Sequence, residues 1–348
     1  MLSRDVGKRI KEGDINFFEP IKDILQKADI LCGNLESPIS DNAVRIGAFC
    51  APKKSIEIIK NFHVLNLANN HIYDCGSQGI EDTLYLLKRY NILGIGIGKS
   101  LAEAYKPVVI EQTGEKIAFI GCTTYEIFHG IRNYDSKYYI ATLGEELEKA
   151  IENLRSNDDF IVILVHGGNE FIPFPPPSLM LSLEKLISLG ADLVVTHHPH
   201  VIGGYKLIEE KNGKKLIWYS LGDFLFDSEV GKRKETGLLT VRIESNKISY
   251  FEFIPFYINE NYHVEKVDGI LAKHILERIK NISSLINREY YKKNYENLYI
   301  KEFLSFQKEK FYTIYRKHGL IFLSKYILKS LRYVFTYIKM FIVKGISE

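Results

Sequence analysis

Short apolar runs alternate with longer helical patterns over the first two thirds of the chain. The runs have the length of buried strands at residues 30–34, 64–67, 92–97, 106–111, 116–122, 160–166 and 193–197. Apolar positions recur with helical spacing between several of these runs, at residues 18–27, 78–90, 144–155 and 178–189. Alternation of buried strands with helices is typical of α/β proteins, so the pattern predicts an α/β domain with a largely buried sheet.

The pattern changes at about Tyr205, where strands follow one another without helices between them. Strands are predicted at residues 205–210, 215–220, 238–243 and 247–254, with a hairpin turn at Lys211-Asn212-Gly213. This section predicts either a second sheet packed on the first or one long mixed sheet. After about Val267 the helical period continues to the end, so we expect a domain over residues 1–260 and a helical extension over residues 261–348.

Composition and charge narrow the class of protein. With 348 residues, 46% hydrophobic and 26% charged, the chain can bury a large core and is neither disordered nor collagen-like. Four cysteines stand singly, so we expect no disulfide framework and a reducing compartment. The sequence has no signal-like start and no apolar run of spanning length, which predicts a soluble cytoplasmic protein. Residues 261–348 are basic, with 17 Lys/Arg against 8 Asp/Glu.

Polar residues cluster where predicted strands end, which is where α/β sheets usually place their sites. Five such segments are residues 33–37, 68–71, 166–170, 196–200 and 219–224. His198 and His200 would point the same way if their loop is extended, and imidazoles with a carboxylate can hold divalent metals. Each segment alone also fits a polar loop with solvated or core-satisfied histidines. Asn70-His71 could be a turn, and Glu36 could flank the turn at Ser37-Pro38.

Taken together, the segments resemble a known family from residue 1 to about residue 227. The motifs are Ala28-Asp29-Ile30 with Asn34-Leu35-Glu36, Ala68-Asn69-Asn70-His71 with Asp74 and Gly76, His166-Gly167 with Glu170, Gly190-Ala191-Asp192 with His197-His198-Pro199-His200, and Tyr219-Ser220-Leu221-Gly222. In this order they resemble calcineurin-like metallophosphoesterases of the CapA type, which serve poly-gamma-glutamate capsule biosynthesis. The resemblance implies a four-layer αββα sandwich of two mixed sheets flanked by helices.

The resemblance also implies roles for individual residues. Glu36 looks like the carboxylate that bridges two metals, Asn70, His166 and His198 look like ligands of the second metal, and His200 looks like a ligand of the first. His71 resembles the residue that contacts the substrate phosphate or leaving oxygen, and Asp74 either orients His71 or caps a turn. Asn34, Glu170 and His197 are expected on the substrate side, although Glu170 could equally be a surface residue. The metals could be Mn, Fe, Zn or Mg.

One element of the family pattern is absent from this sequence. Family members open with a strand ending in Gly-Asp, whose Asp completes the first metal site. The chain begins just after that point, and Gly13-Asp14 or Asp5 would be poor substitutes. Either the true start lies upstream, which we favour because a lost buried strand leaves backbone groups unpaired, or the first strand is missing. We therefore expect two metals in a longer form and one complete site here. Thr196 and Asp223 replace the usual Gly and Asn.

The basic extension allows two interpretations. Over residues 320–343, Lys325, Lys329, Arg332 and Lys339 fall on one stripe of an otherwise apolar helix. Such a helix can lie on an anionic membrane, at the inner face if the protein is cytoplasmic, or simply pack on the body with its lysines in water. No nucleic-acid partner is expected, because the apolar share is too high.

The sequence thus predicts a metal-dependent phosphoesterase-like hydrolase in capsule or surface-polysaccharide biosynthesis. Its substrate would be a phosphorylated or amide-linked biosynthetic intermediate. The alternative is a non-catalytic accessory protein of a membrane-associated biosynthesis complex that keeps a vestigial metal site.

Overall fold

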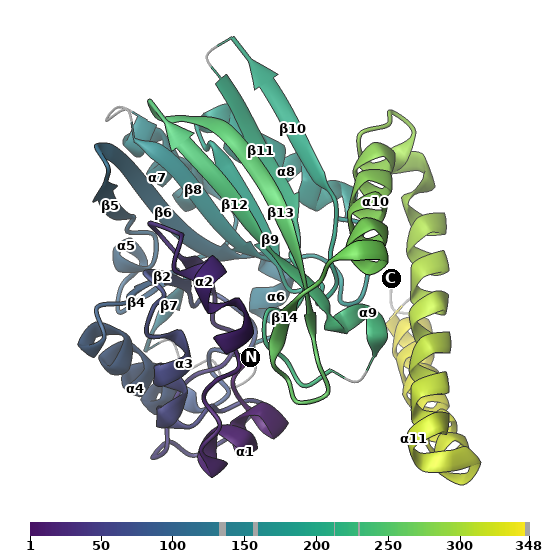
Figure 1. Ribbon diagram of the computed structural model, residues 1–348. Coiled ribbons are helices and arrows are strands. Elements are labelled where there is room, and N and C mark those ends of the chain that lie inside the picture. The colour runs from purple at the N-terminus through teal and green to yellow at the C-terminus, as the bar shows by residue number, and fades with distance from the viewer. Residues whose placement is uncertain (132–136, 156–158, 212, 229, 345–348) are drawn as a thin grey trace.

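A six-stranded mixed sheet forms the centre of the molecule (Figure 1). The computed structural model describes residues 1–131, 137–155, 159–211, 213–228 and 230–344, without the side chains of residues 325 and 328–344. The strands, in spatial order, are β10 (Tyr205–Glu210), β11 (Gly213–Tyr219), β9 (Leu193–His197), β8 (Phe160–His166), β6 (Glu115–Thr123) and β5 (Val108–Gln112). The four inner strands run parallel, and the two edge strands are antiparallel to their neighbours.

Two three-stranded sheets form a second layer against the central sheet. One is parallel, with β1 (Cys32–Asn34), β2 (Val64–Asn66) and β3 (Leu93–Ile95). The other is antiparallel, with β12 (Glu235–Glu244), β13 (Lys247–Ile258) and β14 (Val264–Lys266). Val64 and Ile95 from the first sheet and Phe253 from the second share one buried cluster with Phe160 and Trp218 of the central sheet. A small sheet joins β4 (Ile97–Gly98) to β7 (Tyr139–Ile140).

Helices cover the outer faces of both layers. On the central sheet lie α7 (Glu145–Arg155) and α8 (Pro177–Leu189), whose buried residues join those of β6 and β8 in one cluster. On the second layer lie α1 (Arg4–Glu12), α3 (Ile56–Ile59) and α4 (Gly76–Arg89). The remaining short helices are η1 (Glu19–Ile21), α2 (Lys22–Leu25), η2 (Lys53–Ser55), α5 (Leu101–Ala104), α6 (Tyr125–His129) and α9 (Gly231–Lys234). The expected four-layer αββα sandwich with a helical extension is confirmed.

The C-terminal helices are attached to this sandwich. Helix α10 (Gly269–Ile286) contacts β10 and β13 and buries Ile275, Ile279, Ile282 and Ile286. Helix α11 (Tyr291–Lys344) breaks at Gly319, whose φ is 78°, and folds back so that the rings of Phe311 and Tyr326 lie 6.2 Å apart. The division at residue 260 stays a prediction. No helix within the described residues is long and apolar enough to cross a membrane.

Helix α1 at the start of the chain was not among the elements predicted from the sequence. It turns Val6 and Ile10 into the core and its charges outward. Residues 18–27 were expected to form one helix, yet they form only η1 and the four-residue α2. Proline is tolerated only in the first turn of a helix. Pro20 lies in the first turn of η1, so no helix can extend through it from the residues before. Residue 212 of the predicted hairpin turn lies outside the described residues, but β10 and β11 pair as expected.

A disulfide joins Cys50 and Cys75, with their Cα atoms 6.1 Å apart. The sequence predicted no disulfide framework and gave no indication of this single disulfide, while Cys32 and Cys122 are free thiols. The two half-cystines are separated by 25 residues. They meet because the chain folds back on the start of α4, an approach that cysteine spacing alone does not reveal.

Candidate metal centre

The carboxyl ends of strands from both layers meet at one edge of the sandwich. His166 ends β8 and is directly paired with His197 at the end of the neighbouring parallel strand β9. Asn34 ends β1 in the facing layer and is paired with Asn66 of β2. Because β1 also contacts β8, side chains that follow these four strands are brought together.

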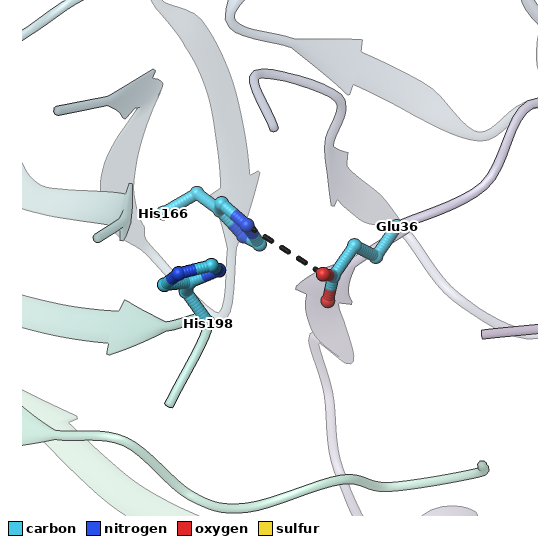
Figure 2. A group of neighbouring side chains, drawn as sticks. All are labelled: Glu36, His166 and His198. Carbon is cyan, nitrogen blue, oxygen red and sulfur yellow. Dashed lines mark ion pairs between the residues drawn. The ribbon is translucent and has the colours of Figure 1, made fainter. Parts of the chain in front are cut away.

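Glu36, His166 and His198 form the core of the site (Figure 2). All three are buried, and one potential ligand atom from each lies within 4.8 Å of the others. His166 Nε2 is 3.6 Å from Glu36 Oε1 and 3.0 Å from Asn70 Oδ1. Glu36 Oε1 has no hydrogen-bond partner among the described residues. The contact with His166 is too long for a hydrogen bond, and a buried carboxylate oxygen without one is costly. A cation would satisfy this oxygen, so the residues fit a divalent metal.

A second group extends the site through His200. One potential ligand atom each from Glu170, His198 and His200 also lies within 4.8 Å of the others, although Glu170 is exposed. His200 Nε2 is 3.7 Å from Glu36 Oε1, so Glu36 faces both groups. The predicted extended loop is wrong, because φ is 105° at His198 and 58° at His200. These left-handed conformations cost energy in residues other than glycine, yet they still bring both rings to one site, 5.9 Å apart.

Burial sets the charge of the imidazoles. It lowers the pKa of His198 to about 3 and that of His197 to about 4, and it lowers the pKa of His166 well below its ordinary value. These rings are therefore neutral at pH 7 and keep a lone pair for a cation. Burial acts on His200 in the same direction, but the carboxylates of Asp223 and Glu36 raise its pKa overall. Burial likewise raises the pKa of Glu36.

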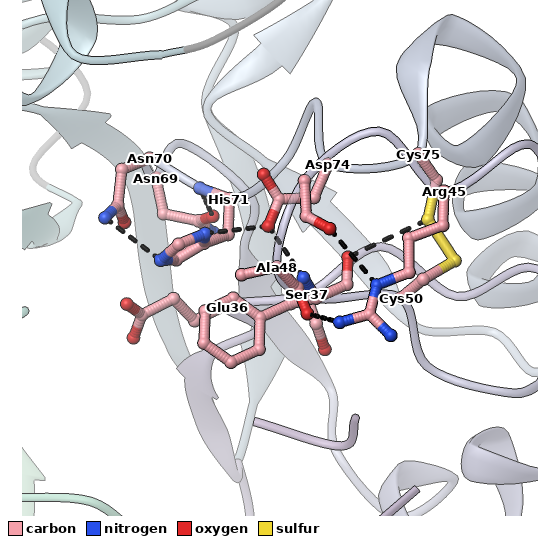
Figure 3. Close-up of polar contacts among 12 residues, drawn as sticks. Glu36, Ser37, Arg45, Ala48, Cys50, Asn69, Asn70, His71, Asp74 and Cys75 are labelled. Atoms are coloured by element: carbon pink, nitrogen blue, oxygen red, sulfur yellow. Dashed lines mark hydrogen bonds and ion pairs between the residues drawn. A yellow bond between two sulfur atoms is a disulfide. The ribbon is translucent and has the colours of Figure 1, made fainter. Parts of the chain in front are cut away.

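Beside this cluster, His71 is held between two neighbours (Figure 3). Its Nδ1 lies 2.9 Å from Asp74 Oδ2, and its Nε2 lies 3.2 Å from the side-chain nitrogen of Asn70. An amide nitrogen only donates and a carboxylate only accepts, so this network assigns the proton to Nδ1 and the lone pair to Nε2. Asp74 is therefore placed to orient His71, which is one of the two roles predicted for this aspartate.

A loop attached by the disulfide holds Asp74 in turn (Figure 3). The backbone N–H of Phe49 donates to Asp74 Oδ2 at 2.8 Å, and the N–H groups of Ile46 and Gly47 donate to the Asp74 carbonyl. A Cβ atom at Gly47 would lie only 2.0 Å from Asp74 Oδ1, so this close approach requires glycine. Phe49 also packs edge-on against the His71 ring, with centroids 4.3 Å apart.

The residues expected on the substrate side lie in different places. Asn34 and His197 line a cavity of about 130 Å³ that runs from the outer edge of β1 to the start of β12 and reaches Glu36 and His200. Asn34 Oδ1 also accepts a hydrogen bond from Asn66 at 3.3 Å. Neither carboxylate considered as a substitute donor joins the cluster: Asp14 pairs with Arg9 and His263, and Asp5 pairs with Lys8.

Sequence reasoning missed the groups that support His200. Asp223 Oδ1 lies 2.7 Å from His200 Nδ1, and Arg233 lies 3.4 Å from the other oxygen of Asp223. Asp223 had been noticed only as a departure from the usual asparagine. A carboxylate behind a histidine fixes the tautomer and orientation of the ring, and Asp223 is placed to do this for His200.

Comparisons with known proteins bear on this site. A sequence profile described as bacterial capsule synthesis protein PGA_cap matches residues 1–228. The chain belongs to this family. Within the PGA_cap match lie all the residues proposed above as metal ligands, from Glu36 to His200.

Individual relatives agree with the PGA_cap assignment. The PGA biosynthesis protein CapA of Bacillus subtilis is 29% identical over an alignment of 305 residues that covers 82% of this chain and 76% of that protein. The capsule biosynthesis protein CapA of Bacillus anthracis is 26% identical over 276 residues, 73% of this chain and 66% of that protein, just under two thirds. The CapA resemblance is thus confirmed.

Solved structures give a weaker match. A putative 5'-nucleotidase from Staphylococcus aureus covers 77% of this chain and 53% of its own, with a TM-score of 0.42 and 14% identity. The calcineurin-like phosphoesterase YfkN of Bacillus subtilis covers 65% and 72%, with a TM-score of 0.37 and 14% identity. The family assignment therefore rests on the sequence profile and the CapA relatives.

Proposed function

We propose that this chain is a metal-dependent phosphoesterase-like hydrolase that acts in the biosynthesis of a capsule or related surface polymer. The observation that carries the proposal is the buried Glu36 Oε1, which lacks a hydrogen-bond partner among the described residues and faces His166 and His200. Both oxygens of a purely structural carboxylate in this position would be expected to accept hydrogen bonds. The place in polymer biosynthesis is supported by membership in the PGA_cap family.

The chain supplies the groups that this chemistry needs. Glu36, His166, His198 and the amide oxygen of Asn70 would hold a divalent cation, with His200 beside them. Such a cation, when bound, polarises a phosphoryl oxygen and makes a bound water more acidic. His71 is oriented by Asp74 and has its lone pair on Nε2 next to Asn70, so Nε2 can accept a proton there and pass it to the leaving oxygen. The substrate class is a phosphorylated or amide-linked biosynthetic intermediate.

The experiment combines metal analysis with hydrolysis of bis(p-nitrophenyl) phosphate after loading with Mn²⁺ or Zn²⁺. We expect His198→Ala to lose bound metal and hydrolysis together while keeping the circular dichroism of the native fold. Lys149→Met is a surface control on α7, because Lys149 is exposed and its ion pair within the described part of the chain is with the neighbouring Glu146. Full hydrolysis by His198→Ala, or no metal and no hydrolysis in the unmodified protein, would overturn the proposal.

A second candidate function is that of an accessory protein bound to an anionic membrane surface through α11. Its support is that α11 carries exposed apolar side chains, among them Leu304, Tyr312, Leu320 and Ile321. A relative from Mycobacterium tuberculosis, 25% identical over 181 residues, is named a probable polyglutamine synthesis accessory protein. The predicted basic stripe at Lys325, Lys329, Arg332 and Lys339 lies outside the described side chains.

A further inference from the structure

Two arginines contact one aromatic ring beside the candidate metal centre. The guanidinium carbon of Arg233 lies 4.6 Å from the centroid of the Phe226 ring, and that of Arg4 lies 5.7 Å from it. The Phe226 ring is itself 5.4 Å from the ring of His200. Arg4 belongs to α1 and Arg233 to α9, two helices that are distant in sequence. Through Phe226, both guanidinium groups lie near His200, the histidine that faces Glu36.

Arg233 is fixed on several sides. Its guanidinium also lies 4.9 Å from the Phe171 ring, so it is held between two aromatic side chains. Its Nη2 lies 3.4 Å from Asp223, the carboxylate that holds His200. The side chain is only 13% exposed, and its Nε is a buried donor without a partner among the described residues. Such a donor favours an incoming acceptor.

Arg4 reaches the same ring from α1. Its Nε pairs with Asp227 at 3.1 Å, and its side chain stays 46% exposed. Its guanidinium also lies 5.7 Å from the ring of Phe49, which packs against His71. Arg4 therefore borders both the His71 side and the His200 side of the centre, through Phe49 and Phe226.

The paired aspartates position these arginines without using up their donors. A guanidinium carries five N–H groups in a planar fork, and each ion pair engages a single nitrogen. The remaining donors of two pre-oriented forks match the oxygens of a phosphate or a carboxylate, which arginine binds in bidentate fashion. Because the aromatic contacts already restrict both side chains, little further conformational entropy is lost on binding.

We propose that Arg4 and Arg233 form an anion-binding position that receives a phosphate or carboxylate group of the substrate beside the candidate metal centre. The inference rests on the proposed hydrolase function for its link to a substrate, but the anion-binding position itself can be measured without turnover. It assigns the substrate an anionic group at the rim of the site, in addition to the group that meets Glu36 and the histidines.

The test is calorimetric titration of the purified full chain with inorganic phosphate and, separately, with glutarate. Arg4→Lys and Arg233→Lys keep the positive charge and replace the planar guanidinium, with its paired N–H donors, by an ammonium group. We expect each variant to weaken binding of the preferred anion about tenfold, or ~1.4 kcal/mol. Arg9→Lys, on the same helix but paired with Asp14, is the matched control and should bind as the unmodified protein does. Tighter binding of phosphate identifies a phosphoryl group, and tighter binding of glutarate identifies a carboxylate.

Metal content and melting temperature are measured on every variant. If Arg233→Lys does not fold, Arg4→Lys still tests the proposal, because the Arg4 side chain is exposed and its replacement should leave the fold intact. Equal affinity in all variants, or no binding of either anion by the unmodified protein, would overturn the anion-binding position. Absence of metal or of hydrolysis with intact, arginine-dependent anion binding would instead refute the proposed hydrolase and leave this position standing.

Discussion

Replacing Glu36 with glutamine should make the metal-free protein more stable and should remove most of the stabilisation that metal provides. Glu36 is 7% exposed, and its Oε1 has no hydrogen-bond partner among the described residues. An unsatisfied buried polar group costs about 1–3 kcal/mol, and more when it is charged. Glutamine keeps the shape, removes the charge and can pair its amide with His166 or His200. We therefore expect the metal-free Glu36→Gln protein to be about 1–3 kcal/mol more stable than the unmodified protein.

Metal should reverse this order. A cation at 100 times its dissociation constant stabilises the protein that binds it by about 2.7 kcal/mol, and Glu36→Gln should lose most of this gain. The assay is urea unfolding at pH 8 with EDTA and with MnCl₂. Glu170→Gln is the control for the metal-free comparison, because an exposed carboxylate should change stability by no more than about 0.5 kcal/mol. A metal-free Glu36→Gln protein that is less stable than the unmodified one, or that is still stabilised fully by manganese, would refute the reasoning.

Three further predictions concern other parts of the chain. Cys50→Ser should lower the free energy of unfolding by roughly 3.5 kcal/mol, the loop-closure value for a crosslink spanning 25 residues, and dithiothreitol should have a matching effect on the unmodified protein only. The metal-free protein should lose stability as pH falls from about 6.5 towards 4, by up to ~1.4 kcal/mol per pH unit for each histidine. The reason is that the lowered pKa values of His197 and His198 leave the unfolded chain binding more protons; a flat urea midpoint would contradict this. Removing residues 320–348 should abolish co-sedimentation with anionic vesicles and leave metal content unchanged; persistent co-sedimentation would argue against membrane binding through α11.

Periodicity was a good guide to the fold where burial dominates. Strands such as β8, buried along its whole length, and helices such as α8 lie within a residue or two of their predicted bounds. It failed for α1, because that helix buries only Val6, Gly7 and Ile10 and is otherwise polar. A helix that contributes one narrow apolar stripe leaves too weak a signal among charged neighbours.

For the site, the sequence indicated most of the groups but not their partners. His166, His198 and Glu36 could be named because their segments, taken in order, resemble the motifs of the CapA family. The support of His200 by Asp223, and of Phe226 by two arginines, depends on how separate loops approach one another in space. The same holds for Phe49 against His71. No local pattern encodes such contacts, since they are set by tertiary packing.

The candidate ligands are widely spaced along the chain, and this bears on how fast the protein folds and unfolds. Glu36 follows a strand of one layer, whereas His166 and His198 follow strands of the other. The centre can exist only after both layers have docked, a step that requires contacts between distant parts of the sequence and is therefore slow and late. Interactions absent from the transition state for folding act on the rate of unfolding alone. Bound metal should therefore lengthen the lifetime of the folded state while leaving the refolding rate unchanged.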